Sequence, residues 1–290
     1  MLGVSKVIQN RRSELGLTII VIILSGASAS LIIFAPLDII SYATFRDVAI
    51  IPSIIAIFAI GILVRSKFPR LTNRLFIGMA AGAVASFALE AIRIPGYMFA
   101  KWIPMDSMIS LPGLLLTEKI TALGEIKQVI MQSGVPMNLY HAPLDAFMAG
   151  GLWHFWNGAT FGIVYALFIG KGKWWYGLIW AFIIEIGMML APYLIIMKGP
   201  FGIEHMDGYN IFVITLIAHL AFGAVLGILV QKWKKDYEPT TTKNDDKVMF
   251  QVKCADCGCL PEECKNSLSA KECPNCSWDE CCCWATIVNR

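Results

Sequence analysis

Six long apolar runs constrain the fold of this chain more than any other feature of its sequence. A helix needs about 20 mostly apolar residues to cross the hydrocarbon core of a bilayer. The runs predict six transmembrane helices, over residues 17–35, 48–64, 75–94, 145–169, 174–197 and 209–231. Only 16% of the residues are charged, against about 25% in ordinary soluble domains. The sequence therefore predicts an all-α integral membrane protein, with a six-helix bundle over residues 1–231.

Basic side chains gather at alternate connections between the expected helices. They precede the first helix, follow the second, fourth and sixth, and are Lys6, Arg11, Arg12, Arg65, Lys67, Arg70, Arg74, Lys171, Lys173, Lys232, Lys234 and Lys235. Short cytoplasmic loops of membrane proteins are enriched in lysine and arginine. The pattern predicts a multipass protein of the cytoplasmic membrane with both termini in the cytoplasm. A net charge of +3 gives no reason to expect a nucleic-acid partner.

The first apolar run has an alternative interpretation. Its basic start, its apolar stretch and the small residues SGASAS near Ala29 resemble a signal peptide. However, the run continues through LIIFAP and reaches the length of a spanning helix, which favours its retention. Cleavage would remove this helix and leave the others in place.

The segment from Pro95 to about Leu139 is expected on the outer side. It opens with a Pro-Gly pair, which typically stops a helix. Within it, residues 113–132 mix apolar and charged residues in a way that suits a helix lying on the membrane surface. We expect a connector here, and a lid over the outer mouth is the alternative.

Four of the expected helices carry an ionisable residue at one end of a row of small residues. The fourth and sixth share the pattern His-x3-Gly-x3-Gly, and the third and fifth show the reverse order. The rows are His154–Gly158–Gly162, His219–Gly223–Gly227, Gly82–Ser86–Glu90 and Gly177–Ala181–Glu185. Steps of four keep such residues on one helix face, where small residues let two backbones approach closely. The pattern suggests a helix-pair repeat, which is common in transporters, although small-x3-small spacing alone occurs in many membrane bundles.

Depth in the membrane can be counted from the basic residues at the helix ends. With a rise of about 1.5 Å per residue, Glu90 and His154 lie roughly 25 Å from that end. By the same count, Glu185 and His219 lie roughly 19 Å from it. We therefore expect two neighbouring Glu–His pairs, one helical turn apart. Arg93 stands one turn from Glu90 and is expected to neutralise it as an ion pair.

His141 and Asp145 lie outward of these pairs and are expected at the outer mouth, where they would govern access. Ionisable groups deep in a membrane usually mark a functional path or site. The structural alternative is that Glu90 and Arg93 form a stabilising ion pair and that each histidine hydrogen-bonds a neighbouring backbone.

Two imidazoles and two carboxylates match the ligand types of zinc, iron or manganese sites inside helical bundles. The candidate ligands in the membrane are His154, Glu185, His219 and Glu90. The same groups could relay protons or hold a co-transported cation, and two histidines on facing helices could hold haem. The sequence contains no Glu-x-x-His motif, so its similarity to carboxylate di-iron bundles is incomplete.

The composition changes sharply after the last helix. Residues 232–251 form a polar linker without apolar periodicity. All nine cysteines then fall within residues 252–290. The spacing C-x2-C-x15-C-x2-C predicts a four-thiolate metal site, formed by Cys254, Cys257, Cys273 and Cys276.

The two knuckles, CADCG and CPNCS, resemble those of zinc ribbons and of rubredoxin-like modules over about residues 252–278. The resemblance implies a tetrahedral zinc or iron site, with electron transfer if the metal is iron. Ser277 stands where the family usually has glycine. The remaining tail cysteines form either a second thiolate site or disulfides, and a cytosolic location favours reduced thiols. The membrane part is similar only to uncharacterised multipass proteins, which imply no activity.

The sequence favours a membrane protein that binds and moves a metal ion or protons and carries a cytosolic thiolate tail with zinc or iron. One alternative is a membrane redox enzyme, with iron or haem in the bundle and a rubredoxin-like tail. Another is an assembly or scaffold subunit whose buried charges are structural. The expected partners are lipid and metal ions, together with a second copy of the chain or another subunit of a membrane complex.

Overall fold

The computed structural model divides the chain into two units, Met1–Asp236 and Tyr237–Arg290. The residues whose structure it describes are 2–34, 40–100, 106–120, 142–169, 172–192, 195, 201, 210–233, 252–254 and 285–287. The main described elements of the first unit are all helical. In chain order they are α1 (Leu2–Ala29), α2 (Leu31–Phe34), α3 (Tyr42–Phe45), the π-helical segment η2 (Arg46–Ile50), α4 (Ile51–Leu63), α5 (Pro69–Ala100), α6 (Asp106–Leu116), α8 (Leu144–Ile169), α9 (Tyr176–Met189) and α11 (Asn210–Trp233).

Four segments within the described residues are long and apolar enough to cross a membrane. They are Arg12–Ala29, Tyr42–Leu63, Pro69–Pro95 and Phe212–Trp233. Large apolar side chains are exposed on their surfaces, among them Ile23, Ile55, Ile62, Phe87 and Val213. Water is an unfavourable environment for so many apolar side chains, whereas lipid accommodates them. The first unit is therefore a helical bundle of the membrane type.

Helices α8 and α9 correspond to the other two spans that the sequence predicts. α8 has 26 residues, but His154 and Asn157 interrupt its apolar sequence. α9 has 14 residues, fewer than the about 20 that a crossing requires. By length and composition, the described part of the chain thus shows four spans.

Near two prolines, the helix ends in the structure differ from those that the sequence predicts. The sequence predicts a stop at Pro95, but α5 continues to Ala100 with this proline inside it. Transmembrane helices tolerate proline where neighbouring groups satisfy the freed backbone carbonyl. The fifth span is predicted to reach residue 197, but α9 ends at Met189. Pro192 follows shortly afterwards and has no N–H to continue the helix.

The segment expected on the membrane surface is partly inside the bundle. Leu114 and Leu115 of α6 are almost fully buried, and α6 packs against α8. A Cβ on Gly113 would collide with the backbone of Ala146 in α8. The apolar run before the charged residues thus packs into the core, and residues 121–132 of the predicted surface helix lie outside the described residues.

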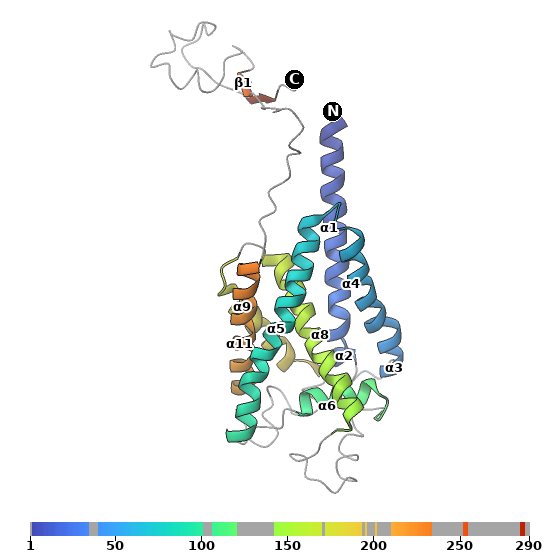
Figure 1. Cartoon of the computed structure of the whole chain (residues 1–290), viewed down its shortest axis with the longest axis vertical. Coiled ribbons are helices and arrows are strands. Elements are labelled where there is room, and N and C mark those ends of the chain that lie inside the picture. The colour runs from blue at the N-terminus through green and yellow to red at the C-terminus, as the bar shows by residue number, and fades with distance from the viewer. Residues whose placement is uncertain are drawn as a thin grey trace, which may run out of the picture. The chain divides into compact units, whose positions relative to one another are not determined.

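The bundle is organised around α5 and α8 (Figure 1). α5 packs against both α8 and α11, and α9 packs against α11. α1 packs against α8 and α4 on the other side. Small and apolar residues fill the contact between α5 and α11, including Ala81, Ala85, Ala218 and Phe222. This packing brings α5, α8, α9 and α11, the four helices with small-residue rows, into one group.

Hydrogen bonds between helix ends place the basic connections at the same end of the first unit. Thr72 donates to the Gly61 carbonyl, which joins the start of α5 to the end of α4. Arg74 donates to the Leu167 carbonyl near the end of α8. The backbone N–H of Trp174 donates to the side chain of Gln231 near the end of α11.

The second unit contains one described strand pair. β1 (Val252–Cys254) pairs antiparallel with β2 (Ala285–Ile287), and Cys254 lies opposite Ala285 in the ladder. The other three predicted tail ligands, Cys257, Cys273 and Cys276, lie outside the described residues.

Candidate functional site

The α5–α8 contact brings two backbones together through glycine. A Cβ on Gly82 would collide with the carbonyl oxygen of Gly158 and would stand 3.0 Å from the Cα of Gly162. Because the obstacle is backbone, no side-chain rotation could relieve the clash. The small residues therefore set how closely α5 and α8 approach.

The α9–α11 contact repeats this arrangement. A Cβ on Gly177 would collide with the carbonyl oxygen of Gly223 and would stand 3.1 Å from the Cα of Gly227. These glycines occupy the same places in their rows as Gly82, Gly158 and Gly162 do in theirs, and they meet the same backbone atoms. The two helix pairs therefore pack in matching registers.

The first pair of helices joins three buried ionisable groups. Arg93 donates from Nη1 to Oε1 of Glu90 over 2.9 Å. His154 Nε2 lies 2.9 Å from the same oxygen. Among the described residues, His154 Nε2 and Glu90 Oε2 have no hydrogen-bond partner, so the imidazole is held at ion-pair distance but outside hydrogen-bond geometry.

The second pair of helices joins Glu185, His219 and Thr215. Thr215 Oγ1 donates to Glu185 Oε1 over 2.6 Å. His219 Nδ1 lies 2.8 Å from the Thr215 carbonyl oxygen and 2.8 Å from Glu185 Oε2. A carbonyl only accepts, so Nδ1 carries the hydrogen in this contact. Nε2 is therefore the ring nitrogen that can exchange a proton.

Arg93 distinguishes the two clusters. It stands three positions after Glu90, and Met188 stands three positions after Glu185. Buried charges are stable only when they are paired. Glu90 and Arg93 already neutralise each other, so the balanced state leaves His154 neutral. Glu185 has no such cation among its described contacts, so its balanced state holds one more proton, on the carboxylate or on His219.

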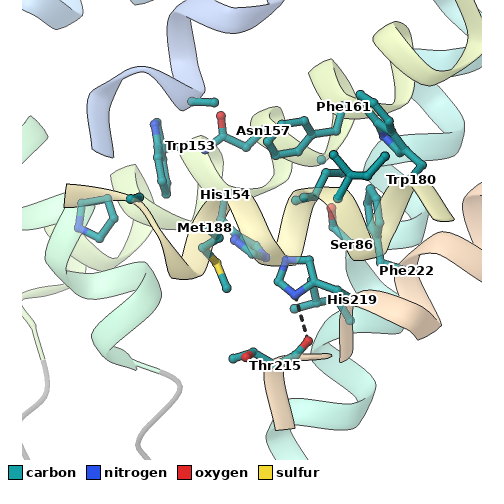
Figure 2. Close-up of a pocket in the computed structure, with 18 of the residues that line it drawn as sticks. Ser86, Trp153, His154, Asn157, Phe161, Trp180, Met188, Thr215, His219 and Phe222 are labelled. Carbon is teal, nitrogen blue, oxygen red and sulfur yellow. Dashed lines mark hydrogen bonds between the residues drawn. The ribbon is translucent and has the colours of Figure 1, made fainter. Parts of the chain in front are cut away.

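Both histidines line one cavity of about 370 Å³ (Figure 2). Helices α1, α2, α5, α6, α8, α9 and α11 contribute to its wall. Most lining side chains are apolar, and the polar exceptions are Ser86, Arg93, His154, Asn157, Thr215 and His219. Glu90 and Glu185 are not among the lining residues and are buried behind their histidines.

The four residues that the sequence selects as candidates for a membrane site are thus gathered as two pairs around a common cavity. They do not form a single ligand set: within the described ranges, no three His, Cys, Asp or Glu side chains are grouped so that they could hold a metal ion. The reason is the packing, because each glutamate meets the histidine of the helix that it packs against.

The outer-mouth residues are placed differently. Asp145 Oδ2 forms an ion pair with Lys119 Nζ at 2.9 Å, and 62% of the Asp145 side chain is exposed. It does not line the cavity. His141 lies outside the described residues.

The sequence interpretation did not identify Thr215, Asn157 or the two cavity tryptophans, Trp153 and Trp180. Thr215 had a usable signal, because it precedes His219 by four positions and extends that row of residues. The tryptophans had none, because a tryptophan in an apolar run faces lipid as readily as a cavity. Trp153 also donates to the Ser28 carbonyl and so ties α8 to α1.

Comparison of the chain with protein families, with characterised proteins and with solved structures finds no match.

Proposed function

We propose that this chain is a six-span membrane protein that moves protons through its two buried Glu–His pairs. The observation that carries the proposal is the repeated pair on one cavity, with Arg93 beside only one of the two. The pairs then differ by one proton in their balanced states, so one can donate while the other accepts.

The atoms of the two clusters that lack a hydrogen bond support this function. Buried polar atoms in proteins nearly always have hydrogen-bond partners, and exceptions often mark functional groups. Glu90 Oε2, His154 Nε2 and Glu185 Oε2 are such exceptions among the described residues. Each of these atoms has a lone pair that can bind a proton.

The position of the basic groups at the cavity wall, in front of the carboxylates, favours protons over metal ions as the transported species. A cation in the cavity would meet the Arg93 guanidinium and the two imidazoles before it reached either carboxylate. The positive charge of Arg93 repels a metal cation, whereas a proton is bound directly by imidazole nitrogen.

The two further spans in this proposal are α8 and α9 with the residues that follow it. Basic residues occupy the α4–α5 connection, the α8–α9 connection and the end of α11. All three lie at one end of the first unit. Basic connections of this kind favour the cytoplasm, which supports the proposal that both termini are cytoplasmic. Reporter fusions at Asn73, Gly172 and Asn244 test this, and an external signal at any of them contradicts it.

The tail is proposed as a cytosolic zinc or iron site with Cys254, Cys257, Cys273 and Cys276 as ligands. The support is the spacing of the cysteines, together with a strand, β1, that ends at Cys254, the first cysteine of the first knuckle. Replacing Cys254 and Cys276 by serine in the full chain should remove one metal ion per chain by elemental analysis. Unchanged metal content would contradict the site.

Proton movement is tested with the purified full chain in liposomes that enclose a pH-sensitive dye. An imposed membrane potential should drive acidification in the wild type. Glu185→Gln should slow it by about tenfold or more, because a neutral amide cannot take up the proton. Asp145→Asn is the matched control and should leave the rate unchanged, since this carboxylate is exposed and outside the cavity.

Two outcomes would redirect the proposal. Equal rates in wild type and Glu185→Gln would exclude the pairs as the proton path and would favour a scaffold subunit with structural charges. Visible absorbance from iron or haem that disappears in His219→Ala would favour a membrane redox enzyme.

A further inference from the structure

The cavity has the size and lining of a small-molecule site. Ligand pockets are usually about 300–1,000 Å³ in volume and mostly apolar, with a few convergent polar groups. This cavity has about 370 Å³ and is lined on its apolar side by Leu89, Trp153, Phe161, Trp180, Ile184 and Phe222. Apolar walls of this kind hold water poorly, so an apolar body is the favoured occupant.

The ionisable side chains of the wall are all basic, and its other polar side chains, Asn157, Thr215 and Ser86, are neutral. Arg93, His154 and His219 face the cavity from α5, α8 and α11, while no carboxylate is among the lining residues that the structure describes. Thr215 and Ser86 use their hydroxyl hydrogens on Glu185 and on the Gly82 carbonyl. The wall therefore offers the Arg93 guanidinium and two imidazoles that become cationic when a proton is added, and it suits an anionic oxygen acceptor. α1, α2 and α6 contribute only Ala29, Ile33 and Pro112, which carry no charge.

We propose that the cavity binds an acyl chain with one anionic head, and that this head is the carboxylate of a medium-chain fatty acid. The head lies among Arg93, His154 and His219, and the chain lies against the aromatic wall. The inference rests on the proposed function in one respect: a bound anion stabilises an added proton on the neighbouring imidazoles, so anion and proton enter together.

Gly187 supplies a way to fill the cavity without disturbing the packing. It lines the cavity, and a Cβ added to it would meet no atom within 4 Å. Gly187→Phe should therefore occupy ligand space. Gly151 is the matched control, because its Cβ would also meet nothing within 4 Å and it does not line the cavity.

The experiment measures equilibrium binding of radiolabelled decanoate and decanol to the full chain in phosphatidylcholine nanodiscs, with empty nanodiscs subtracted. Decanoate should bind at least about tenfold more tightly than decanol, since only the carboxylate pairs with the cationic groups. Gly187→Phe should abolish decanoate binding, and Gly151→Phe should preserve it. Equal affinity for the two ligands in the unchanged protein overturns the inference, and so does full binding to Gly187→Phe.

The source of the anionic head is tested in nanodiscs that contain phosphatidylglycerol. Unchanged decanoate affinity there supports the fatty acid, whereas a loss of about tenfold identifies the phospholipid as the occupant and overturns the assignment to a fatty acid. Proton uptake on adding decanoate, measured in weak buffer, separates this inference from the proposed function. Tight binding without proton uptake upholds the ligand and contradicts the proton function. Proton transport without decanoate binding does the reverse.

Discussion

The α5–α8 pair and the α9–α11 pair have the same backbone packing but carry different charged groups. In both, a glycine of one helix lies against the backbone of two glycines on the other. In both, a glutamate oxygen and a histidine ring nitrogen lie 2.8–2.9 Å apart, beyond the glycines along the helices. The first pair adds Arg93, whereas the second has Met188 at that place and adds a hydroxyl from Thr215.

The comparison separates two roles that one helix face can carry. The small residues determine where the ionisable side chains meet, since they set the distance between backbones. The residue one turn further along determines the charge of the meeting point. One packing solution can thus hold two clusters with different charged groups.

The largest expected effect comes from removing one carboxylate at a time. Glu90→Gln leaves the buried guanidinium of Arg93 without its counter-charge, and we expect it to destabilise the protein by about 3–5 kcal/mol. Glu185→Gln leaves no arginine or lysine without a partner among the described contacts of Glu185, so we expect it to destabilise the protein by only about 1–2 kcal/mol. Thermal unfolding in a fixed detergent measures both changes.

The double change Glu90→Gln with Arg93→Met is the control for this comparison. It removes both charges and gives α5 the methionine that α9 carries. Most of the lost stability should return, because two neutral side chains replace a buried charge that has lost its counter-charge. Equal losses in the two single variants, with no recovery in the double variant, would show that the clusters do not differ in charge.

The next effect concerns the feature that the two pairs share. Gly82→Leu and Gly177→Leu should each cost about 1–3 kcal/mol or more, because the new side chain would collide with backbone. The two losses should be similar if the registers match. Gly151→Leu is the control and should be nearly neutral, since its Cβ points into open space. A large loss at Gly82 alone would break the equivalence of the pairs.

A smaller effect is expected at the hydroxyl that only the second pair has. Thr215→Val keeps the shape of the side chain but leaves Glu185 Oε1 without its donor. We expect a loss of about 1 kcal/mol and a change in the pH dependence of proton uptake. Thr160→Val removes a hydroxyl that donates to the backbone of its own helix, so uptake should keep its pH dependence. The same shift in both variants would count against a role for Thr215.

The smallest effect is expected outside the cavity. Lys119→Ala breaks the exposed ion pair with Asp145, and such pairs contribute about 0–1 kcal/mol. Both stability and proton movement should stay close to those of the wild type. A strong reduction in proton movement would instead mean that the outer mouth controls access to the cavity.

Much of the candidate site was predictable because helical periodicity is a local property. Steps of four put Glu90 and Glu185 at the ends of small-residue rows and put His154 and His219 on the matching rows. Antiparallel packing of such rows then brings each acid to a histidine. Depth counted from the basic helix ends also predicts two Glu–His pairs. Whether the two pairs combine into one ligand set could not be predicted, because it depends on how the four helices pack, and the described residues form no such set.

The cavity and the course of the helix ends also required the structure. Its tryptophans, Trp153 and Trp180, come from α8 and α9, and sequence position alone does not say that they line the same cavity. Pro95 and Pro192 carry the same local signal, yet α5 continues through the first and α9 ends before the second. Neighbouring elements decide whether a missing N–H is tolerated.

The sequence by itself determined that this is a helical membrane protein with ionisable residues on small-residue faces. The length of the apolar runs and the four-residue spacing are local features of the sequence. Only the tertiary structure decided that α5 pairs with α8 and α9 with α11, that the glutamates lie behind the histidines, and that both histidines share one cavity. These arrangements depend on contacts between residues far apart in the sequence. Several helix pairings would bury similar apolar faces, and close backbone packing selects among them.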